Sequence, residues 1–498
     1  MKLKFGTGGL RAVMGSGEEE MNLNVIRTAT MGVASYIKGF CKQPKAAIAY
    51  DTRKNSDVFA RETARILALE GCHVFIFPIP TPTPLLSFAV RELKCDFGVC
   101  ITASHNPKEY NGYKVYGADG CQITNKTAGA IQEEIESVRI DDGITNSTYE
   151  ELLSKQKISH ISEEMNRKYL QAILCCRFGK NRIQNLRVVY TPLNGTGLVP
   201  MMKMMEAIGV KNLNIVKEQT KQDGEFTTCP VPNPEEDEAL SLGKRLCEKV
   251  HADILLATDP DSDRIGVAAK RGDVYERLSG NQLGVLLLDY VLKKRREANL
   301  LSEDSVIFKT IVTTSMAEHI AAEYGVQTIN TLTGFKYIGE QIGKLESSGQ
   351  LNRFVLGVEE SCGYLIGPYV RDKDAIGAAM IVCEMADEYK REGMTLWGKL
   401  ESLYQKHGKY QSELISRQYK NNEAKAHMSE LREKLRKSET VKYEGNKVLK
   451  YEDYIEGLHG LPPSDVIRLW LDNDTIVVIR PSGTEPKIKI YKEHRLEI

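Results

Sequence analysis

Residues 46–77, AAIAYDTRKNSDVFARETARILALEGCHVFIF, carry the pattern that decides the fold. An apolar run, AAIAY, leads through a polar turn into an amphipathic stretch over about Ser56 to Glu70, then a glycine and a second apolar run, HVFIF. Glycine commonly ends a helix, so the segment predicts a β-α-β unit. The same plan returns over 186–216 and 306–330. Strands that alternate with helices of this length predict a parallel or mixed sheet with helical cover in each repeat.

The repeats divide the 498 residues into four predicted domains around a central cleft. Three similar α/β domains with mixed sheets are predicted over 1–160, 161–300 and 301–410. The segment 411–498 differs, because it combines a charged helix with the strand-loop-strand IVVIRPSGTEPKIKIYKE, and it predicts a smaller α+β domain. Helices are expected over 163–174, 283–298, 375–404 and 423–437. Four domains fit the length, at roughly 150 residues or somewhat fewer for each domain.

The composition limits the kinds of partner that the protein is expected to bind. Lys plus Arg equal Asp plus Glu at 67 each, so no net charge draws the protein to nucleic acid or to an anionic membrane. Eleven cysteines are scattered without a CxxC pair, which indicates reduced thiols. No apolar run reaches the roughly 18 residues that span a bilayer. We therefore expect a cytoplasmic protein with a small-molecule partner, and a homo-oligomer stays open.

Four apolar, β-branched runs end in polar loops of complementary chemistry. They are 97–101 before TASHNP, 254–257 before TDPDSDR, 354–358 before EESCG, and 475–479 before RPSGTEP. In open α/β sheets, ligands bind in the crevice beyond the carboxyl ends of the strands. The four loops are therefore predicted to form four walls of one site.

The second loop predicts a metal site. Asp259, Asp261 and Asp263 occupy alternate positions, so three carboxylates can converge on one hard cation, and Mg²⁺ fits best. An EF-hand is excluded because Arg264 stands where its glycine is required and Lys270 where its glutamate is required. A solvated acidic loop is the alternative. The nine histidines show no zinc-binding spacing.

The first and third loops carry hydroxyl and carboxyl groups. Ser104 in TASHNP follows a strand directly, and a serine there can accept a phosphoryl group when a metal and a base assist it. A plain turn or helix cap would have a similar composition. Glu359 and Ser361 supply an anionic acceptor and a hydroxyl two residues apart, which suit neighbouring sugar hydroxyls.

The fourth loop predicts a phosphate cradle. Arg480 offers a planar fork of donors, Ser482 and Thr484 offer hydroxyls, and Gly483 lets backbone N–H groups approach an anion. An ordinary Pro-Ser-Gly turn is the alternative. The glycines of FGTGGLR do not form a dinucleotide loop, because no strand precedes them and Arg11 stands where GxGxxG needs its last glycine.

TASHNP, DPDSDR, GVEESCG and RPSGT, in this order, resemble the four active-site loops of the α-D-phosphohexomutase superfamily, and the resemblance covers essentially the whole chain. FGTGGLR, KEYNGYKVY, TGFKYIG and VRDKDA make it most similar to the phosphoglucomutase and phosphomannomutase branch. The resemblance implies a mutase that interconverts hexose 1-phosphate and hexose 6-phosphate, with glucose as the expected hexose. A phosphoserine enzyme and an activating hexose 1,6-bisphosphate are implied with it.

The resemblance also implies roles for individual residues. Ser104 would carry the phosphoryl group and bind Mg²⁺ with the three aspartates. Lys114 is the first candidate for the proton carrier and His105 the second, while Arg11 and Arg264 would neutralise developing charge. A lysine base requires a lowered pKa. The implied substrate-binding residues are Thr333, Gly334, Lys336, Glu359, Ser361, Arg371, Lys373, Arg480, Ser482, Gly483 and Thr484.

Several alternatives stay open at this stage. Phosphomannomutase and phosphopentomutase activities belong to the same family, and the sequence does not separate glucose from mannose. A magnesium-dependent sugar-phosphate hydrolase would not need a phosphate held at both ends, and a non-catalytic sensor would be expected to lose the serine or an aspartate. The chain starts four residues before FGTGGLR, where relatives carry a helical lead-in, which leaves open whether the amino terminus is complete.

Overall fold

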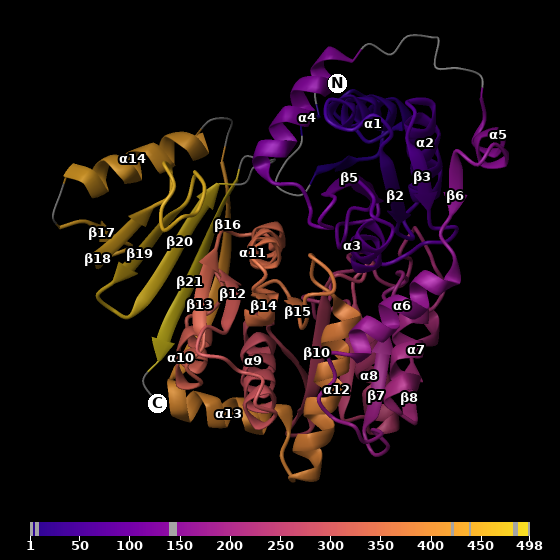
Figure 1. Cartoon of the computed structure of the whole chain (residues 1–498). Helices are drawn as coiled ribbons and strands as arrows, with labels where there is room; N and C mark the ends of the chain where they lie inside the picture. The colour runs from indigo at the N-terminus through magenta and orange to yellow at the C-terminus, as the bar shows by residue number, and fades with distance from the viewer. Residues whose placement is uncertain are drawn as a thin grey trace.

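Four β-sheets follow one another along the residues that the structure describes, which are 3–4, 9–138, 147–419, 423–437, 440–481 and 487–496. The structure is a computed structural model. Figure 1 shows the first sheet with its helices at the upper right, the second and third below it, and the fourth at the left. Across these described ranges, we find no helix with the length and apolar character needed to cross a membrane.

The first sheet is mixed and has the strand order β1-β5-β4-β2-β3-β6. Its strands are β1 (Leu10–Val13), β2 (Lys45–Tyr50), β3 (His73–Ile76), β4 (Phe97–Ile101), β5 (Tyr110–Gly117) and β6 (Ile158–His160). β2 pairs in parallel with β3 and β4, whereas β5 runs antiparallel to β4 and β1. The accompanying helices are α1 (Leu23–Lys38), α2 (Ser56–Leu69), α3 (Thr83–Glu92), α4 (Asn125–Ser137) and α5 (Tyr149–Ser154).

The second sheet has the order β11-β10-β9-β7-β8. Its strands are β7 (Arg187–Thr191), β8 (Asn212–Ile215), β9 (Ile254–Thr258), β10 (Ile265–Arg271) and β11 (Val274–Leu278). The helices in this part of the chain are α6 (Glu163–Leu174), α7 (Leu198–Ile208), the short 3₁₀ turn η1 (Lys217–Gln219) and α8 (Ser241–Val250).

The third sheet has the order β13-β12-β14-β15, with β12 (Val306–Thr310), β13 (Gln327–Thr331), β14 (Phe354–Glu359) and β15 (Gly363–Leu365). Its helices are α9 (Gly280–Glu297), α10 (Met316–Glu323), α11 (Phe335–Ser347), η2 (Leu351–Arg353), α12 (Ala375–Arg391) and α13 (Leu396–His407). α9 begins three residues before the predicted start because Ser279 and Gln282 form a capping box.

The fourth sheet is antiparallel throughout and has the order β16-β21-β20-β19-β18-β17. Its strands are β16 (Lys409–Gln418), β17 (Lys442–Tyr443), β18 (Asn446–Asp453), β19 (Ile467–Leu471), β20 (Thr475–Pro481) and β21 (Lys487–Leu496). α14 (Glu423–Lys437) covers one face, with Met428 and Leu431 buried in the same apolar cluster as Ile479 and Ile488 of the sheet.

The first three sheets repeat one arrangement. In each, the first strand of the β-α-β unit lies between two parallel neighbours. The neighbour that comes later in the sequence is followed by an antiparallel strand that pairs with it. The loops TASHNP, DPDSDR and EESC therefore occupy equivalent turns, from β4 to β5, β9 to β10 and β14 to β15. This confirms the predicted fold class of three similar α/β units and a smaller α+β unit. The predicted domain limits stay a prediction.

Apolar side chains join these units. One cluster includes buried residues of α3, α6, α9 and α12, so the first three units share a core. A smaller cluster joins Ile311 and Tyr337 of the third unit to Tyr454 and Val478 of the fourth. Because buried side chains pack at a fixed density, these contacts fix the distances between the sheet ends that carry the loops.

Candidate active site

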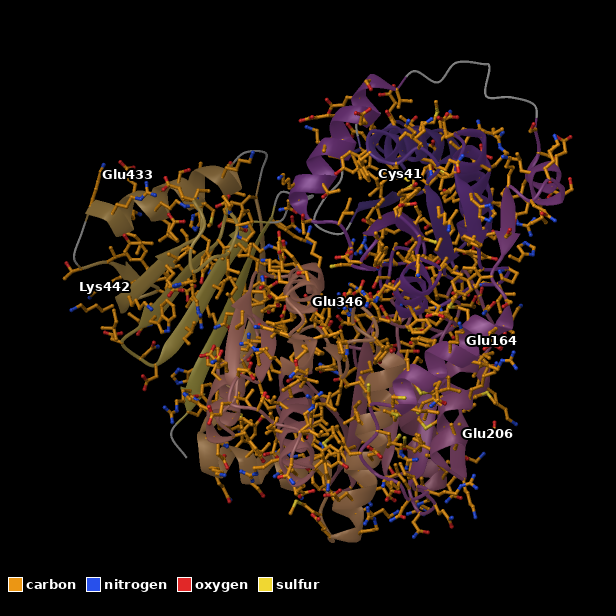
Figure 2. All side chains as sticks on the ribbon, in the orientation of Figure 1. Cys41, Glu164, Glu206, Glu346, Glu433 and Lys442 are labelled. Atoms are coloured by element: carbon orange, nitrogen blue, oxygen red, sulfur yellow. The ribbon has the colours of Figure 1, made fainter. Side chains whose placement is uncertain are left out.

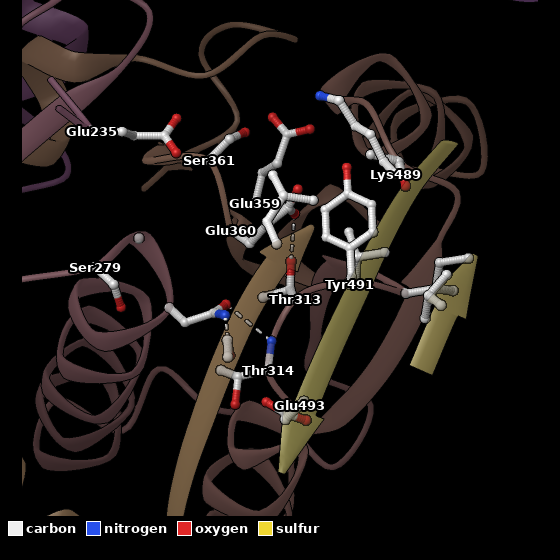
Figure 3. Close-up of a pocket in the computed structure, with 18 of the residues that line it drawn as sticks. Glu235, Ser279, Thr313, Thr314, Glu359, Glu360, Ser361, Lys489, Tyr491 and Glu493 are labelled. Atoms are coloured by element: carbon white, nitrogen blue, oxygen red, sulfur yellow. Dashed lines mark hydrogen bonds between the residues drawn. The ribbon is translucent and has the colours of Figure 1, made fainter. Parts of the chain in front are cut away.

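The loops at the strand ends surround one cavity of about 810 Å³. Small-molecule sites usually measure about 300–1,000 Å³, so the cavity has the size of a ligand site. Each unit contributes to the lining: Ser104 comes from the first, Asp263 from the second, Glu359 from the third and Arg480 from the fourth. Figure 3 shows the part of the wall where Glu359, Glu360 and Ser361 approach Lys489 and Tyr491 of β21.

Ser104 lines this cavity with a nearly buried side chain. Its side chain is 3% exposed, and its backbone has φ 53°, in the left-handed region that serine rarely adopts. The Oγ atom donates a hydrogen bond to Asp259 Oδ2 at 2.9 Å and lies 3.2 Å from His105 Nδ1. The hydroxyl is thus in contact with a carboxylate of the second loop and with an imidazole.

Asp259, Asp261 and Asp263 present carboxylate oxygens within 4.8 Å of one another, and all three side chains are buried. Burial raises the pKa of Asp259 well above its ordinary value, and repulsion by the other two carboxylates adds to this. Asp261 Oδ1 and Asp263 Oδ1 are buried and have no hydrogen-bond partner within the described part of the chain. Hard oxygen donors without partners fit a divalent cation, so the residues present suit Mg²⁺.

Lys114, the first candidate for the proton carrier, lies on β5 and lines the cavity. Its Nζ donates to Asp261 Oδ2 at 2.9 Å and lies 3.6 Å from Asp263 Oδ2. Burial lowers the pKa of Lys114, but the two carboxylates outweigh burial and raise it. The lowered pKa that a lysine base requires is therefore not found in this structure.

Three other predicted polar residues lie around Ser104. Arg11 of β1 lines the cavity and donates to Asn106 Oδ1 at 2.8 Å. Arg264 donates to Glu235 Oε1 at 2.6 Å, and its backbone N–H donates to Asp259 Oδ1 at 3.0 Å. Burial, followed by the positive charges of Arg264 and Arg11, lowers the pKa of His105 well below its ordinary value, so the imidazole is neutral.

A further wall of the cavity comes from the third unit. Glu359 is 6% exposed, and it lines the cavity with Ser361, Thr333 and Gly334. The hydroxyl of Thr333 is buried without a hydrogen-bond partner in the described ranges, so it is free to bind a ligand. Lys373 also lines the cavity, but its Nζ donates to Asp263 Oδ2 at 2.7 Å and therefore connects this wall to the acidic loop.

Two predicted substrate-binding residues do not line the cavity as the described residues form it. Arg371 is fully buried and donates to the carbonyls of Pro368 and Val370 and to Glu346. Lys336 donates to Asn125 Oδ1 at 2.8 Å, and burial lowers its pKa to about 8. In this structure the two cations are bound by other groups of the protein, so their substrate-binding roles stay predictions. Ser482, Gly483 and Thr484 lie outside the described residues.

Other residues of the cavity wall were not predicted from the sequence. Lys489 and Tyr491 lie on β21, and Glu235 lies in the segment NPEE. The alternation of KIKIY after the fourth loop could have indicated Lys489 and Tyr491, because residues two apart on a strand share a face. Nothing in the pattern around Glu235 indicated that it would pair with Arg264.

Comparison with known proteins decides the family. Models described as phosphoglucomutase/phosphomannomutase alpha/beta/alpha domains I, II and III match residues 2–140, 167–272 and 279–407. The chain belongs to this phosphoglucomutase/phosphomannomutase family. Members of the family are mutase-type isomerases. The family model thus matches the three repeated units in the order in which the chain presents them.

One curated relative and two solved structures illustrate the similarity in sequence and in fold. A phosphoglucomutase of Staphylococcus epidermidis is 33% identical over 98% of this chain and 90% of its own length. A phosphoglucomutase/phosphomannomutase family protein of Burkholderia thailandensis has the same fold, with a TM-score of 0.73, 20% identity and coverage of 99% and 93% of the two chains. An N-acetylphosphoglucosamine mutase of Aspergillus fumigatus, solved with GlcNAc-6P and magnesium, aligns with a TM-score of 0.55, 13% identity and coverage of 99% and 92%.

Proposed function

We propose that this family member is a phosphoglucomutase, which interconverts glucose 1-phosphate and glucose 6-phosphate through phospho-Ser104 and glucose 1,6-bisphosphate. The observation that carries the proposal is the contact between the Ser104 hydroxyl and Asp259 beside a cavity to which four units contribute. Serine is a weak nucleophile unless neighbouring groups assist it, and here a carboxylate and an imidazole both contact its oxygen.

The reaction consists of two phosphoryl transfers. In the first, the bond between Ser104 Oγ and phosphorus breaks and a bond to the free sugar hydroxyl forms, which gives the bisphosphate. In the second, the other phosphate of the bisphosphate returns to Ser104. His105 is placed to carry the proton at Ser104, because its Nδ1 lies 3.2 Å from Oγ. Lys114, Arg11 and Arg264 supply positive charge where the transferred group becomes more negative.

Ser104, Asp259, Asp261 and Asp263 would hold Mg²⁺. When bound, this ion supplies Lewis-acid stabilisation of phosphoryl oxygens. The A. fumigatus mutase of the same fold was solved with magnesium and a sugar phosphate, which supports both the metal and the substrate class.

The far wall suits a sugar that binds in two orientations. Glu359, Ser361 and Thr333 offer acceptors and hydroxyls to ring hydroxyls in either orientation. Arg480 and Lys489 line the cavity from the fourth unit and offer positive charge to the phosphate that is not reacting. A hydrolase would need no such second phosphate site, so this wall supports a mutase. Glucose is proposed because the 33% identical relative is a phosphoglucomutase.

All eleven cysteines are free thiols in the structure. Most are buried, and burial raises the pKa of Cys95, Cys72 and Cys229 to about 12, so these thiols are unreactive. Unpaired cysteines in this number support a reducing compartment, and we place the reaction in the cytoplasm.

The test combines an assay with mass spectrometry. The wild type, incubated with Mg²⁺ and glucose 1,6-bisphosphate, should gain one phosphoryl group on Ser104 and convert glucose 1-phosphate in a coupled assay. Ser104→Ala should do neither, whereas Ser154→Ala, an exposed serine of α5, should behave as the wild type. Isomerisation by Ser104→Ala, or a wild type with neither phosphoryl group nor activity, would refute the proposal. Parallel assays with mannose 1-phosphate and ribose 1-phosphate test the choice of glucose.

A further inference from the structure

We infer that Arg53 and Thr102 are positioning residues that hold Ser104 in its left-handed backbone conformation and thereby aim its hydroxyl. The inference rests on the proposed function, because it assumes that Ser104 carries the phosphoryl group. Neither residue is among the described residues that line the cavity, so both act through Ser104.

Ser104 needs such support because its conformation is unfavourable. A residue with a side chain has a steric cost at φ 53°, and it stays there only when the surrounding structure fixes it. If the loop relaxed, the direction of the Cα–Cβ bond would change and the hydroxyl would leave Asp259 and His105.

Thr102 fixes the N–H of Ser104. The backbone nitrogen of Ser104 donates to Thr102 Oγ1 at 2.8 Å, and Thr102 Oγ1 donates its own proton to Asp51 Oδ2 at 2.7 Å. Asp51 is buried and also accepts hydrogen bonds from Ser56 Oγ at 2.7 Å and from the N–H of Arg53 at 3.0 Å. The threonine hydroxyl is therefore used both as acceptor and as donor, and its position is set by a buried carboxylate.

Arg53 fixes the carbonyl of Ser104 and the rest of the loop. Its Nη2 donates to Ser104 O at 2.6 Å and also to Asn106 O, and its Nη1 donates to Pro107 O at 2.8 Å and Tyr110 O at 3.1 Å. One planar guanidinium thus binds four carbonyls of the segment that contains Ser104. Lysine has a single nitrogen and cannot reproduce this fork of donors.

Arg53 is itself held in place. Its side chain is fully buried, and its Nε lies 3.3 Å from Asp51 Oδ2. The ring of Phe226, from the second unit, covers the guanidinium at 5.0 Å. Because one face and the edge of this group are engaged, its position cannot shift without moving the loop.

The experiment uses matched substitutions in the full-length protein. Thr102→Val keeps the shape but removes the hydroxyl, Thr102→Ser restores it, and Arg53→Lys keeps the charge without the fork. Thr63→Val is the control, because Thr63 is also buried in the first unit and its hydroxyl has no partner among the described residues. Thermal unfolding, kcat, KM and the rate of Ser104 phosphorylation by glucose 1,6-bisphosphate are measured for each.

We expect Thr102→Val and Arg53→Lys to lower kcat and the phosphorylation rate by at least about tenfold with KM within about twofold, since misplacement of about 1 Å can cost about 100-fold. Thr102→Ser should recover most of the loss, and Thr63→Val should match the wild type. Wild-type kcat in folded Thr102→Val, or equal losses in Thr102→Val and Thr102→Ser, would overturn the inference. If Arg53→Lys does not fold, the comparison of Thr102→Val with Thr102→Ser decides whether the inference holds. Absence of a phosphoryl group on Ser104 of the wild type would instead refute the proposed function.

Discussion

The three carboxylates of the loop after β9 lie close together and are almost completely buried. Asp259, Asp261 and Asp263 are each 1% exposed or less, and the Oδ1 atoms of Asp261 and Asp263 have no partner in the described ranges. Buried like charges repel, and the ammonium groups of Lys114 and Lys373 offset this repulsion only in part. A divalent cation would add the remaining positive charge and satisfy the two oxygens.

We therefore expect Mg²⁺ to stabilise the protein as well as to support activity. A ligand present at 100 times its Kd stabilises the native state by about 2.7 kcal/mol, so the midpoint of thermal unfolding should rise with Mg²⁺ and fall with EDTA. Asp261→Asn should lose most of this shift, whereas Asp273→Asn, an exposed aspartate in the turn between β10 and β11, should keep it. A wild type with equal midpoints and equal activity in Mg²⁺ and in EDTA would rule out the metal site.

Glu359 provides a second test at this scale. Its carboxylate is nearly buried at the cavity wall, where it can accept hydrogen bonds from sugar hydroxyls. Glu359→Gln keeps the size and removes the charge. Hydrogen bonds to charged groups contribute about 1.5–3 kcal/mol, so we expect kcat/KM for glucose 1-phosphate to fall roughly 10- to 100-fold. Steady-state kinetics check this, with the exposed Glu303→Gln as control, and an unchanged kcat/KM would remove Glu359 from the site.

The residues whose neighbourhood could be predicted from the sequence share one physical feature. The neighbourhood of Ser104, the aspartate triplet, Glu359 and Ser361 was predictable because each lies at the end of a strand or in the loop that follows it, and the ends of parallel strands meet at one edge of a sheet. The contacts that Arg371 and Lys336 make were not predictable, because the direction of a long cationic side chain depends on its partner. Glu346 and Asn125, which bind them, lie on helices whose approach no local pattern reveals.

At the scale of elements, the three equivalent turns are built alike. Each contains one non-glycine residue in the left-handed region: Ser104, Ser262 and Cys362. The turns are also bonded to neighbouring segments, since Ile265 N donates to Cys362 O at 3.1 Å, Ala375 N to Ser262 O at 3.3 Å, and Thr83 N to Asp261 O at 2.9 Å. Strands and helices were predictable from periodicity, but this backbone strain was not, because it is maintained by contacts with other segments of the chain.

The start of α12 allows a stability test. Asp374 is fully buried; its Oδ1 accepts from the N–H groups of Ile376 and Gly377, and its Oδ2 accepts from Tyr369 OH at 2.6 Å. Asp374→Ala removes the cap and leaves the partly buried hydroxyl of Tyr369 without its acceptor, so we expect a loss of roughly 2–4 kcal/mol in the free energy of unfolding. Asp374→Asn should lose less because its amide oxygen can still cap the helix. Urea unfolding measures both, and a stable Asp374→Ala would show that the cap is unimportant.

At the scale of the whole molecule, polar contacts cross between units that are far apart in sequence. Glu346 of α11 lies near the middle of the molecule in Figure 2. It accepts hydrogen bonds from both terminal nitrogens of Arg91 on α3, at 3.1 and 2.7 Å, and from Arg371 Nη2 at 2.7 Å. One carboxylate therefore joins the first unit to the third.

This contact predicts a pH dependence of stability. The hydrogen bonds from Arg91, with the charge of Arg371, lower the pKa of Glu346 from its ordinary 4.5 to about 2 although burial opposes the shift. A depressed folded-state pKa stabilises the native state above the unfolded-state pKa, and the contribution is lost as pH falls from about 4.5 towards 2. The carboxylate is 39% exposed, so solvent screening limits the effect to about 1 kcal/mol.

Glu346→Gln should therefore be about 1 kcal/mol less stable than the wild type at neutral pH, and the difference should shrink as the pH approaches about 3. Urea unfolding of both proteins across this range measures it, and Glu303→Gln, whose carboxylate lies in an exposed turn, should show no such convergence. A difference between wild type and Glu346→Gln that stayed constant with pH would mean that the shape of this contact, and not its charge, joins the first unit to the third.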